Sequence, residues 1–194
     1  AQDVLLRAFA EAAGDRPDVR LVLIGDVPEC AAQREMQRYA DDLRQFPVDA
    51  GLADRVRFAG WREDVPAVLA AADGYVHAAR WEGWPLTVME AMAAGVPVVF
   101  TDCAGRPPGF AEGQDGWIVP TEDVHALADR IGRMVQMSPA QRRQMGQAGR
   151  AFCRSHYDIR AVGQRFVAIV EHVLAGETDV GKQFAEGRAT WPCS

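Results

Sequence analysis

The sequence has few of the residues that hold metal ions or form disulfide bonds. Its 194 residues include only four cysteines, which lie far apart, with no Cys-x-x-Cys pair and no histidine at ligand spacing. The four histidines form no His-Glu-x-x-His or similar pattern. The sequence therefore predicts no metal site, and we interpret the cysteines as reduced thiols of a cytoplasmic protein.

Surplus positive charge and long apolar runs are also missing. The chain has 21 Lys and Arg against 27 Asp and Glu, a formal net charge of −6. Because non-specific binding to nucleic acid or to anionic membranes needs clustered Lys and Arg, we expect neither as a partner. The longest apolar runs, such as "VRLVLIG" and "GVPVVF", are too short to cross a bilayer. We therefore expect no membrane segment in this chain.

The sequence does contain an alternation of short apolar runs with amphipathic segments. The apolar runs, which indicate strands, cover residues 19–25, 55–60, 74–78, 97–101 and 116–120. The amphipathic segments, which indicate helices, cover residues 2–13, 29–45, 64–72 and 86–94. This alternation predicts an α/β fold, with a parallel sheet covered by helices on both faces. Ligands of such sheets bind beyond the carboxyl ends of the strands.

Three more helices are predicted after the last strand. They begin near residues 123, 139 and 158. The second has a capping box, because Ser138 precedes it and Gln141 can bond back to the helix start. Helical periodicity ends after residue 175, so we predict a domain over residues 1–175 and an irregular tail over 176–194.

The stretch "RWEGWPLTVMEAMAAGVPVV" places Glu82 and Glu90 eight positions apart. The Gly-Trp-Pro sequence between them disfavours one continuous helix, so we place Glu82 on a loop and Glu90 on a helix that begins near Leu86. The amides of that helix's first turn have no intrahelical partner and suit a phosphate. Glu90 points back toward the same end, where its carboxylate can accept from sugar hydroxyls. The arrangement favours a nucleotide as ligand.

The same residues also support a structural interpretation. Thr87-Val88-Met89-Glu90 fits a capping box, in which Glu90 only ties down the helix start. Spacing alone does not decide between this cap and a ligand role. His77 ends a predicted strand beside the site, and we interpret it as filling the strand end rather than as a catalytic base.

Four blocks of sequence follow one another along the predicted sheet. They are "LVLIGDVPE", "RVRFAGWREDVPAVLAAAD", "RWEGWPLTVMEAMAAGVPVVFTDCAGRP" and "DGWIVPTED". In this order they resemble the C-terminal, nucleotide-sugar-binding domain of family 4 glycosyltransferases of the GT-B fold. Glu82 and Glu90 match the two-glutamate signature of that family. The resemblance implies a Rossmann-like sheet that forms one half of a GT-B enzyme, with the N-terminal acceptor domain absent from this chain.

The resemblance also implies roles for individual residues. Glu90 would accept hydrogen bonds from the ribose, the amides near Leu86 and Thr87 would hold the diphosphate, and Arg62 would lie by the base. Glu82 is the catalytic candidate, which would position the transferred sugar and stabilise charge. The implied substrate-binding residues are Gly25, Arg62, Gly83, Trp84, Leu86, Thr87 and Glu90.

The sequence departs from the family at the phosphate and sugar contacts. The family's arginine and lysine for the diphosphate, which usually precede this part of the chain, are not present. The family's Gly-Gly-x-x-Glu after the fourth strand is Ala-Gly-Arg-Pro-Pro here, and Arg106 of this loop is a weak candidate for a phosphate partner. We therefore expect weak nucleotide binding by this chain.

The sequence as a whole predicts an enzyme. We expect a retaining hexosyltransferase that uses a UDP-, GDP- or ADP-linked sugar as donor substrate, with no cofactor and no metal, and that is inactive without its N-terminal domain. One alternative is a module that binds a nucleotide or nucleotide sugar and has no activity alone. The other is a nucleotide-sugar epimerase of the same fold.

Overall fold

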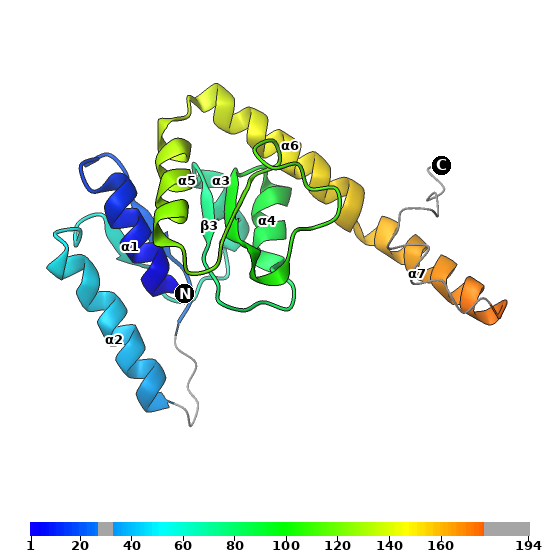
Figure 1. Cartoon of the computed structure of the whole chain (residues 1–194), viewed down its shortest axis with the longest axis horizontal. Helices are drawn as coiled ribbons and strands as arrows, with labels where there is room; N and C mark the ends of the chain where they lie inside the picture. The colour runs from blue at the N-terminus through cyan, green and yellow to red at the C-terminus, as the bar shows by residue number, and fades with distance from the viewer. Residues whose placement is uncertain (27–32, 177–194) are drawn as a thin grey trace. The chain divides into compact units, whose positions relative to one another are not determined.

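The computed structural model of the chain describes residues 1–26 and 33–176 (Figure 1). The chain divides into two compact units, the first over Ala1–Phe152 and the second from Cys153 onward. The tail predicted over 176–194 lies outside the described residues except for Gly176, as do the first residues of the helix predicted over 29–45.

All five predicted strands form, each within its predicted range, and every strand pair is parallel. They are β1 (Leu21–Leu23), β2 (Val56–Phe58), β3 (Tyr75–His77), β4 (Val98–Thr101) and β5 (Trp117–Val119). β1 pairs with β2, whereas the other three strands form a separate ladder in the order β3-β4-β5. The predicted α/β class is confirmed, with the difference that the strands form two hydrogen-bonded sheets.

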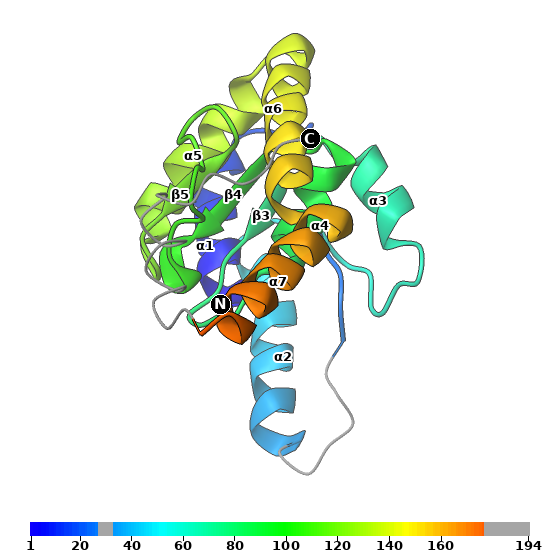
Figure 2. The same cartoon turned by 90° about the vertical axis from the view of Figure 1, so that its right-hand side faces the viewer.

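The helices also follow the predicted pattern. They are α1 (Gln2–Ala13), α2 (Gln33–Asp49), α3 (Val65–Ala71), α4 (Leu86–Ala94), α5 (Val124–Gln136), α6 (Pro139–Tyr157) and α7 (Ile159–Leu174), with a short 3-10 helix at Asp102–Ala104. In the first unit, α1 and α5 cover one face of the β3-β4-β5 sheet and α4 covers the other (Figure 2). The sheet is therefore the middle of three layers.

One predicted helix end is wrong. We expected the helix that begins near residue 29 to end at residue 45, but α2 continues to Asp49 and contains Pro47. The extra turn keeps Phe46 packed against the buried cluster around Leu6 and Phe9. Pro47 lies in the last turn of α2, and its carbonyl accepts from the Leu52 amide at 2.7 Å.

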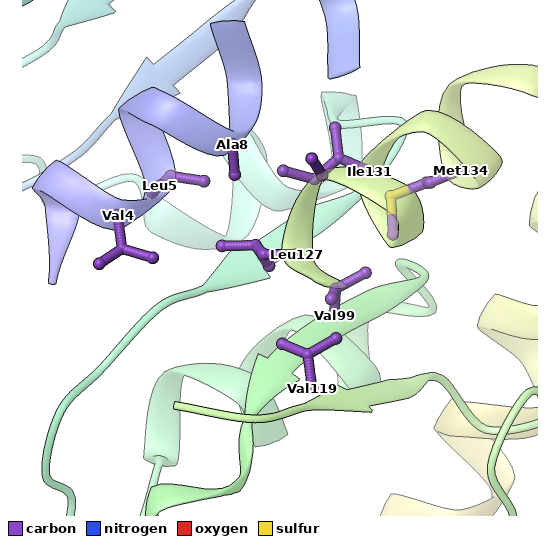
Figure 3. Close-up of a cluster of buried hydrophobic side chains, with 9 residues drawn as sticks. Val4, Leu5, Ala8, Val99, Val119, Leu127, Ile131 and Met134 are labelled. Carbon is purple, nitrogen blue, oxygen red and sulfur yellow. The ribbon is translucent and has the colours of Figure 1, made fainter. Parts of the chain in front are cut away.

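The core of the first unit lies between α1, α5 and the sheet. All four residues of β4 are buried, as a central strand covered on both faces requires. The cluster on the α1 side is drawn in Figure 3, where the helices point their apolar side chains at the strands. Its buried members are Val4, Leu5, Ala8, Val99, Val119, Leu127, Ala128, Ile131 and Met134.

A buried arginine joins α1 to the β1–β2 sheet. Arg55, next to the first residue of β2, donates to the carbonyls of Ala13 at 2.7 Å, Gly14 at 2.8 Å and Arg16 at 2.9 Å. These carbonyls lie at the C-terminus of α1, where the last turn has no intrahelical donors. The guanidinium therefore closes the helix end and neutralises its partial negative charge.

The capping box predicted for α6 is confirmed, and α7 begins next to residue 158, as predicted. The Ser138 amide donates to Gln141 Oε1 at 2.8 Å, and the Gln141 amide donates to Ser138 Oγ at 3.3 Å. Asp158 caps α7 by accepting from the Arg160 amide at 2.9 Å. Of the helices that the structure describes, none is both long and apolar enough to cross a membrane.

Candidate active site

The predicted site lies where β3 leads into α4. The helix begins at Leu86, with Pro85 as its N-cap residue, because the Gly-Trp-Pro sequence before it cannot continue a helix ladder. The Leu86 amide donates to the Trp84 carbonyl at 2.9 Å, whereas the Thr87 amide makes no hydrogen bond with the residues that the structure describes. Of the two amides expected to hold a diphosphate, that of Thr87 is therefore free to bind an anion.

The capping-box interpretation of Glu90 is wrong. No side chain caps α4, and the helix starts one residue before Thr87, so Thr87 cannot be its N-cap. The Thr87 side chain instead acts on Tyr75, on the neighbouring strand β3, and lowers the pKa of that phenol. Glu90 is exposed one turn into the helix, and its carboxylate is left available for a ligand.

Glu82 lies on the loop before α4, as expected, but it has a partner that the sequence did not indicate. Glu82 Oε1 lies 3.2 Å from His77 Nε2, an atom that is buried. Burial lowers the pKa of His77, because it disfavours the charged ring, and the nearby Glu82 carboxylate acts in the opposite direction. His77 fills the end of β3, as predicted, and also contacts the catalytic candidate.

Tyr75 belongs to the site as well, and sequence reasoning missed it. Its ring stacks on that of His77, with centroids 6.4 Å apart and planes 14° apart. Burial raises the pKa of the Tyr75 phenol, the Thr87 side chain lowers it, and the charges of Glu90 and Glu82 raise it further. The alternation of β3 could have revealed the pair, since residues two apart on a strand share one face.

The loops after β1 and β2 meet at the other part of the expected site. The Gly25 amide donates to the Gly60 carbonyl at 2.9 Å, and the two glycines have φ angles of 129° and 67°. Arg62 is exposed, and its Nε donates to Asp64 Oδ1 at 2.7 Å. Trp61 beside it is 77% exposed. Gly25 and Arg62, both predicted to bind substrate, are thus brought to the same sheet edge.

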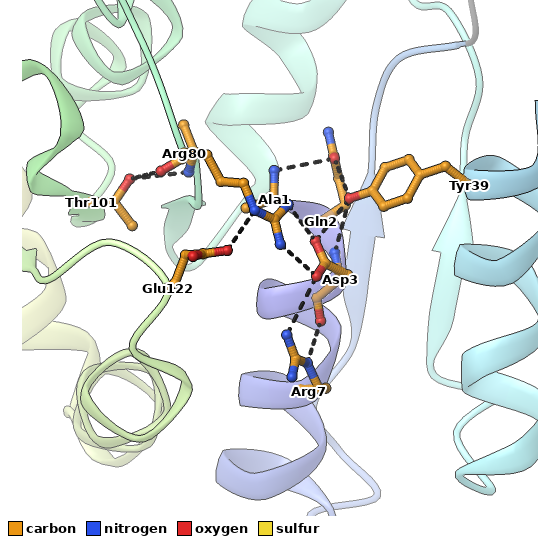
Figure 4. Close-up of polar contacts among 9 residues, drawn as sticks. Ala1, Gln2, Asp3, Arg7, Tyr39, Arg80, Thr101 and Glu122 are labelled. Carbon is orange, nitrogen blue, oxygen red and sulfur yellow. Dashed lines mark hydrogen bonds and ion pairs between the residues drawn. The ribbon is translucent and has the colours of Figure 1, made fainter. Parts of the chain in front are cut away.

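An ion-pair cluster around Arg80 fixes the loop that carries Glu82 (Figure 4). Arg80 pairs with Asp3 of α1 through Nη2–Oδ2 at 2.8 Å and Nη1–Oδ1 at 3.0 Å, and its Nε contacts Glu122 Oε1 at 2.6 Å. Tyr39 of α2 also donates to Asp3 Oδ1, at 2.9 Å. The Arg80 guanidinium holds the pKa of Asp3 well below its usual range. No local sequence signal links Arg80 to Asp3, because 77 residues separate them.

The start of the same loop is bonded to the sheet. Thr101 Oγ1, at the end of β4, accepts from the Ala79 amide at 3.0 Å and donates to the Ala79 carbonyl at 2.9 Å (Figure 4). Thr101 is buried, so both bonds are protected from water. They fix the backbone of Ala79, near the start of the loop that carries Glu82.

Two other features of the sequence have little role in the site. Arg106 is exposed and lies 3.7 Å from Glu112, so it is an exposed partner of a carboxylate rather than a group aimed at the glutamates. Within the described ranges, no three His, Cys, Asp or Glu side chains converge as metal ligands. The chemical groups that the site offers are two carboxylates, a free helix amide and a histidine–tyrosine pair.

The chain combines a parallel α/β fold with two glutamates around a helix N-terminus, and comparison with known proteins gives its family. The sequence profile described as "Glycosyl transferases group 1" matches residues 1–137. The chain belongs to this family. It is 30% identical over 178 residues to a GDP-mannose-dependent α-(1-6)-phosphatidylinositol monomannoside mannosyltransferase of Mycolicibacterium smegmatis, covering 87% of this chain and 44% of the relative.

Solved structures agree with the predicted GT-B fold. HepE from Anabaena, solved in complex with UDP, superposes with a TM-score of 0.78 at 25% identity, over 88% of this chain and 45% of that protein. The C-terminal domain of LpcC, a group 1 protein from Francisella tularensis, has a TM-score of 0.71 at 23% identity, over 81% of this chain and 80% of that domain. The chain thus spans less than half the length of the M. smegmatis relative and of HepE.

Proposed function

We propose that this chain is the donor-binding half of a retaining, metal-independent glycosyltransferase that acts in the cytoplasm. The observation that carries the proposal is the arrangement around the start of α4, where the free Thr87 amide lies between the loop of Glu82 and the exposed carboxylate of Glu90. A phosphate at the helix N-terminus is favoured by the amide and the helix dipole. Glu90 then accepts from the ribose hydroxyls, and Glu82 faces the sugar.

The nature of the donor is supported by the relatives. HepE was solved with UDP, and the mycobacterial relative is named for GDP-mannose. The sugar is therefore carried by a nucleoside diphosphate, with UDP and GDP as the first candidates. The base would lie by the loops of Gly25 and Arg62, which meet at the edge of the β1–β2 sheet.

The proposed reaction keeps the anomeric configuration. The acceptor hydroxyl forms a bond to the anomeric carbon on the face from which the bond to the diphosphate breaks, and its proton passes to the leaving phosphate oxygen. Glu82 stabilises the positive charge that develops on the sugar. An inverting reaction would need a general base on the opposite face, and the proposal assigns that role to no residue of these loops.

The first test is binding by the 194-residue chain. Isothermal titration with UDP, GDP and ADP should show one nucleotide bound at tens of micromolar, on the order of −6 kcal/mol. The affinity is modest because the helix amide is present while the basic pair usual in the family is absent from this sequence. A chain that binds none of the three would contradict the proposal.

The second test concerns the reaction. We expect transfer only when the chain is joined to an N-terminal acceptor domain, since closure of two domains supplies the acceptor and excludes water. The anomeric proton of the product, followed by magnetic resonance, should show retention. Inversion from an α-linked donor would refute the mechanism, and transfer by residues 1–194 alone would refute the need for a second domain.

A further inference from the structure

His77 has an unsatisfied atom beside the catalytic candidate. Its Nε2 is buried and lies 3.2 Å from Glu82 Oε1, but the contact is misaligned, and Nε2 makes no hydrogen bond with the described residues. A buried polar group without a partner is unfavourable, so such an atom calls for an explanation. Contacts of this kind in unliganded enzymes often tighten when the substrate binds.

Of the two groups, the histidine is the fixed one. His77 lies opposite Phe100 in the β3–β4 ladder, and its ring stacks on Tyr75. Its side chain is only 18% exposed, whereas that of Glu82, on the loop, is 31% exposed. A carboxylate on a loop can adopt several rotamers, and a fixed hydrogen-bond donor next to it can favour one of them.

We propose that His77 is a positioning residue, whose Nε2–H holds the Glu82 carboxylate in the orientation in which it contacts the donor sugar. This inference rests on the proposed function, because Glu82 faces a sugar only when the chain binds a nucleotide sugar. The role needs a neutral ring with its proton on Nε2. Burial favours the neutral form, since it lowers the pKa of His77, and the charged groups that act on the ring are Glu82 and the amine of Ala1.

Two variants of similar polarity separate orientation from packing. His77→Gln places an amide nitrogen near the Nε2 position, from which it can reach Glu82. His77→Asn places its amide nitrogen near the Nδ1 position, from which this shorter side chain cannot reach Glu82. The matched control is His125→Gln, because His125 is exposed at the start of α5 and pairs with Glu11 at 3.0 Å.

The measurement compares ligands with and without a sugar. The 194-residue chain is titrated with UDP and UDP-glucose, and with GDP and GDP-mannose, and the affinity ratio within each pair isolates the sugar contact. We expect His77→Asn to lower this ratio about fivefold, as the loss of one hydrogen bond implies, with the nucleotide affinity itself unchanged. His77→Gln and His125→Gln should keep the wild-type ratio. Equal ratios in the Gln and Asn variants would overturn the proposal.

A magnetic resonance titration of the His77 ring tests the contact without any nucleotide. Because Glu82 raises the pKa of His77, Glu82→Gln should lower that pKa further. An unchanged His77 pKa in Glu82→Gln would overturn the positioning role. If the pKa falls but no nucleotide binds to the wild-type chain, the contact between His77 and Glu82 is upheld and the proposed function alone fails.

Discussion

The two sheets of the first unit hold their site loops in different ways. The loop after β3 is bonded to Thr101 at its start and to Asp3 and Glu122 through Arg80, and the sheet behind it has the fully buried strand β4. The loops after β1 and β2 meet through the Gly25 amide and the Gly60 carbonyl, and Val22 of β1 is 48% exposed. The glutamate side of the site is therefore held by tertiary bonds, whereas the expected base side is open.

This difference matches what each side would bind. Charge that develops during a reaction is stabilised best by groups that do not move, so the carboxylates of Glu82 and Glu90 gain from a fixed support. A nucleotide base that is held by stacking and backbone contacts can bind to a loop that adjusts its position. Exposed Trp61 beside Arg62 provides such a surface. Substitutions can test both halves of this comparison.

The largest effect is expected where α6 packs against the end of α4. A Cβ added to Gly146 would lie 1.9 Å from the Gly95 carbonyl oxygen, which is backbone and cannot rotate away. Gly146→Ala should therefore reduce the free energy of unfolding by about 3 kcal/mol, because α4 or α6 must shift. Chemical denaturation of the chain measures the loss.

Gly132 provides the matched control for this substitution. It lies within α5, and a Cβ added there would meet no atom within 4 Å. Gly132→Ala should stabilise the chain by about 0.5–1 kcal/mol, since alanine is the better helix former. Equal losses in the two variants would show that the close approach of α6 to α4 does not support the glutamate side.

The next largest effect concerns ligand affinity. Glu90→Ala should weaken nucleotide binding by roughly 2–3 kcal/mol, because the ribose hydroxyls lose a charged acceptor. The free energy of unfolding should not change, since Glu90 caps no helix. Titration calorimetry and a denaturation curve on the same variant decide. Unchanged affinity with a stability loss near 1 kcal/mol would restore the structural role that the geometry of α4 excludes.

The features with a local sequence signal were predicted, whereas those that depend on distant parts of the chain were not. The strands and the bounds of α1 and α4 were predicted because apolar runs and the Gly-Trp-Pro break are local signals. The two-glutamate pattern was likewise local. The split into two sheets was not predicted, because apolar periodicity shows which segments form strands but contains no information on which strands pair.

The supports of the site were missed for a related reason. Arg80 meets Asp3 and Glu122 from segments 77 and 42 residues away, and Thr101 meets Ala79 across 22 residues. Charged and polar residues at loop ends have many possible partners, and only the folded chain selects among them. The contact of His77 with Glu82 spans only five positions, but it depends on a loop that folds back over its own strand.

A smaller effect is expected for the Arg80 cluster. Arg80→Met should lower the free energy of unfolding at pH 7 by about 1 kcal/mol, since its side chain is half exposed and water screens the pairs. Arg80 lowers the pKa of Asp3, so the pair stabilises the chain above the unfolded pKa of about 4 and loses this effect as pH falls through the folded value. Denaturation at pH 7 and pH 3 should show a smaller acid-induced loss in the variant.

Arg7→Met is the control for Arg80, because Arg7 also contacts Asp3, at 3.3 Å, but does not touch the loop of Glu82. Arg80→Met should in addition weaken nucleotide-sugar binding a few-fold, about 0.5–1 kcal/mol, since the loop loses its anchor. Arg7→Met should leave binding unchanged. Equal binding losses would mean that Asp3, rather than the anchoring of the loop, affects the ligand.

The smallest effect is expected on the open side of the site, at Arg62. Its guanidinium is already paired with Asp64, with Nε 2.7 Å from Oδ1, so it has little charge to offer a nucleotide. Arg62→Ala should weaken UDP or GDP binding by no more than about threefold, because an exposed ion pair contributes little. Titration calorimetry should give the same small change for Asp64→Ala if both residues only shape the loop. A tenfold loss in Arg62→Ala alone would show that Arg62 leaves Asp64 to bind the ligand, and that charged side chains contribute to affinity on the base side as they do on the glutamate side.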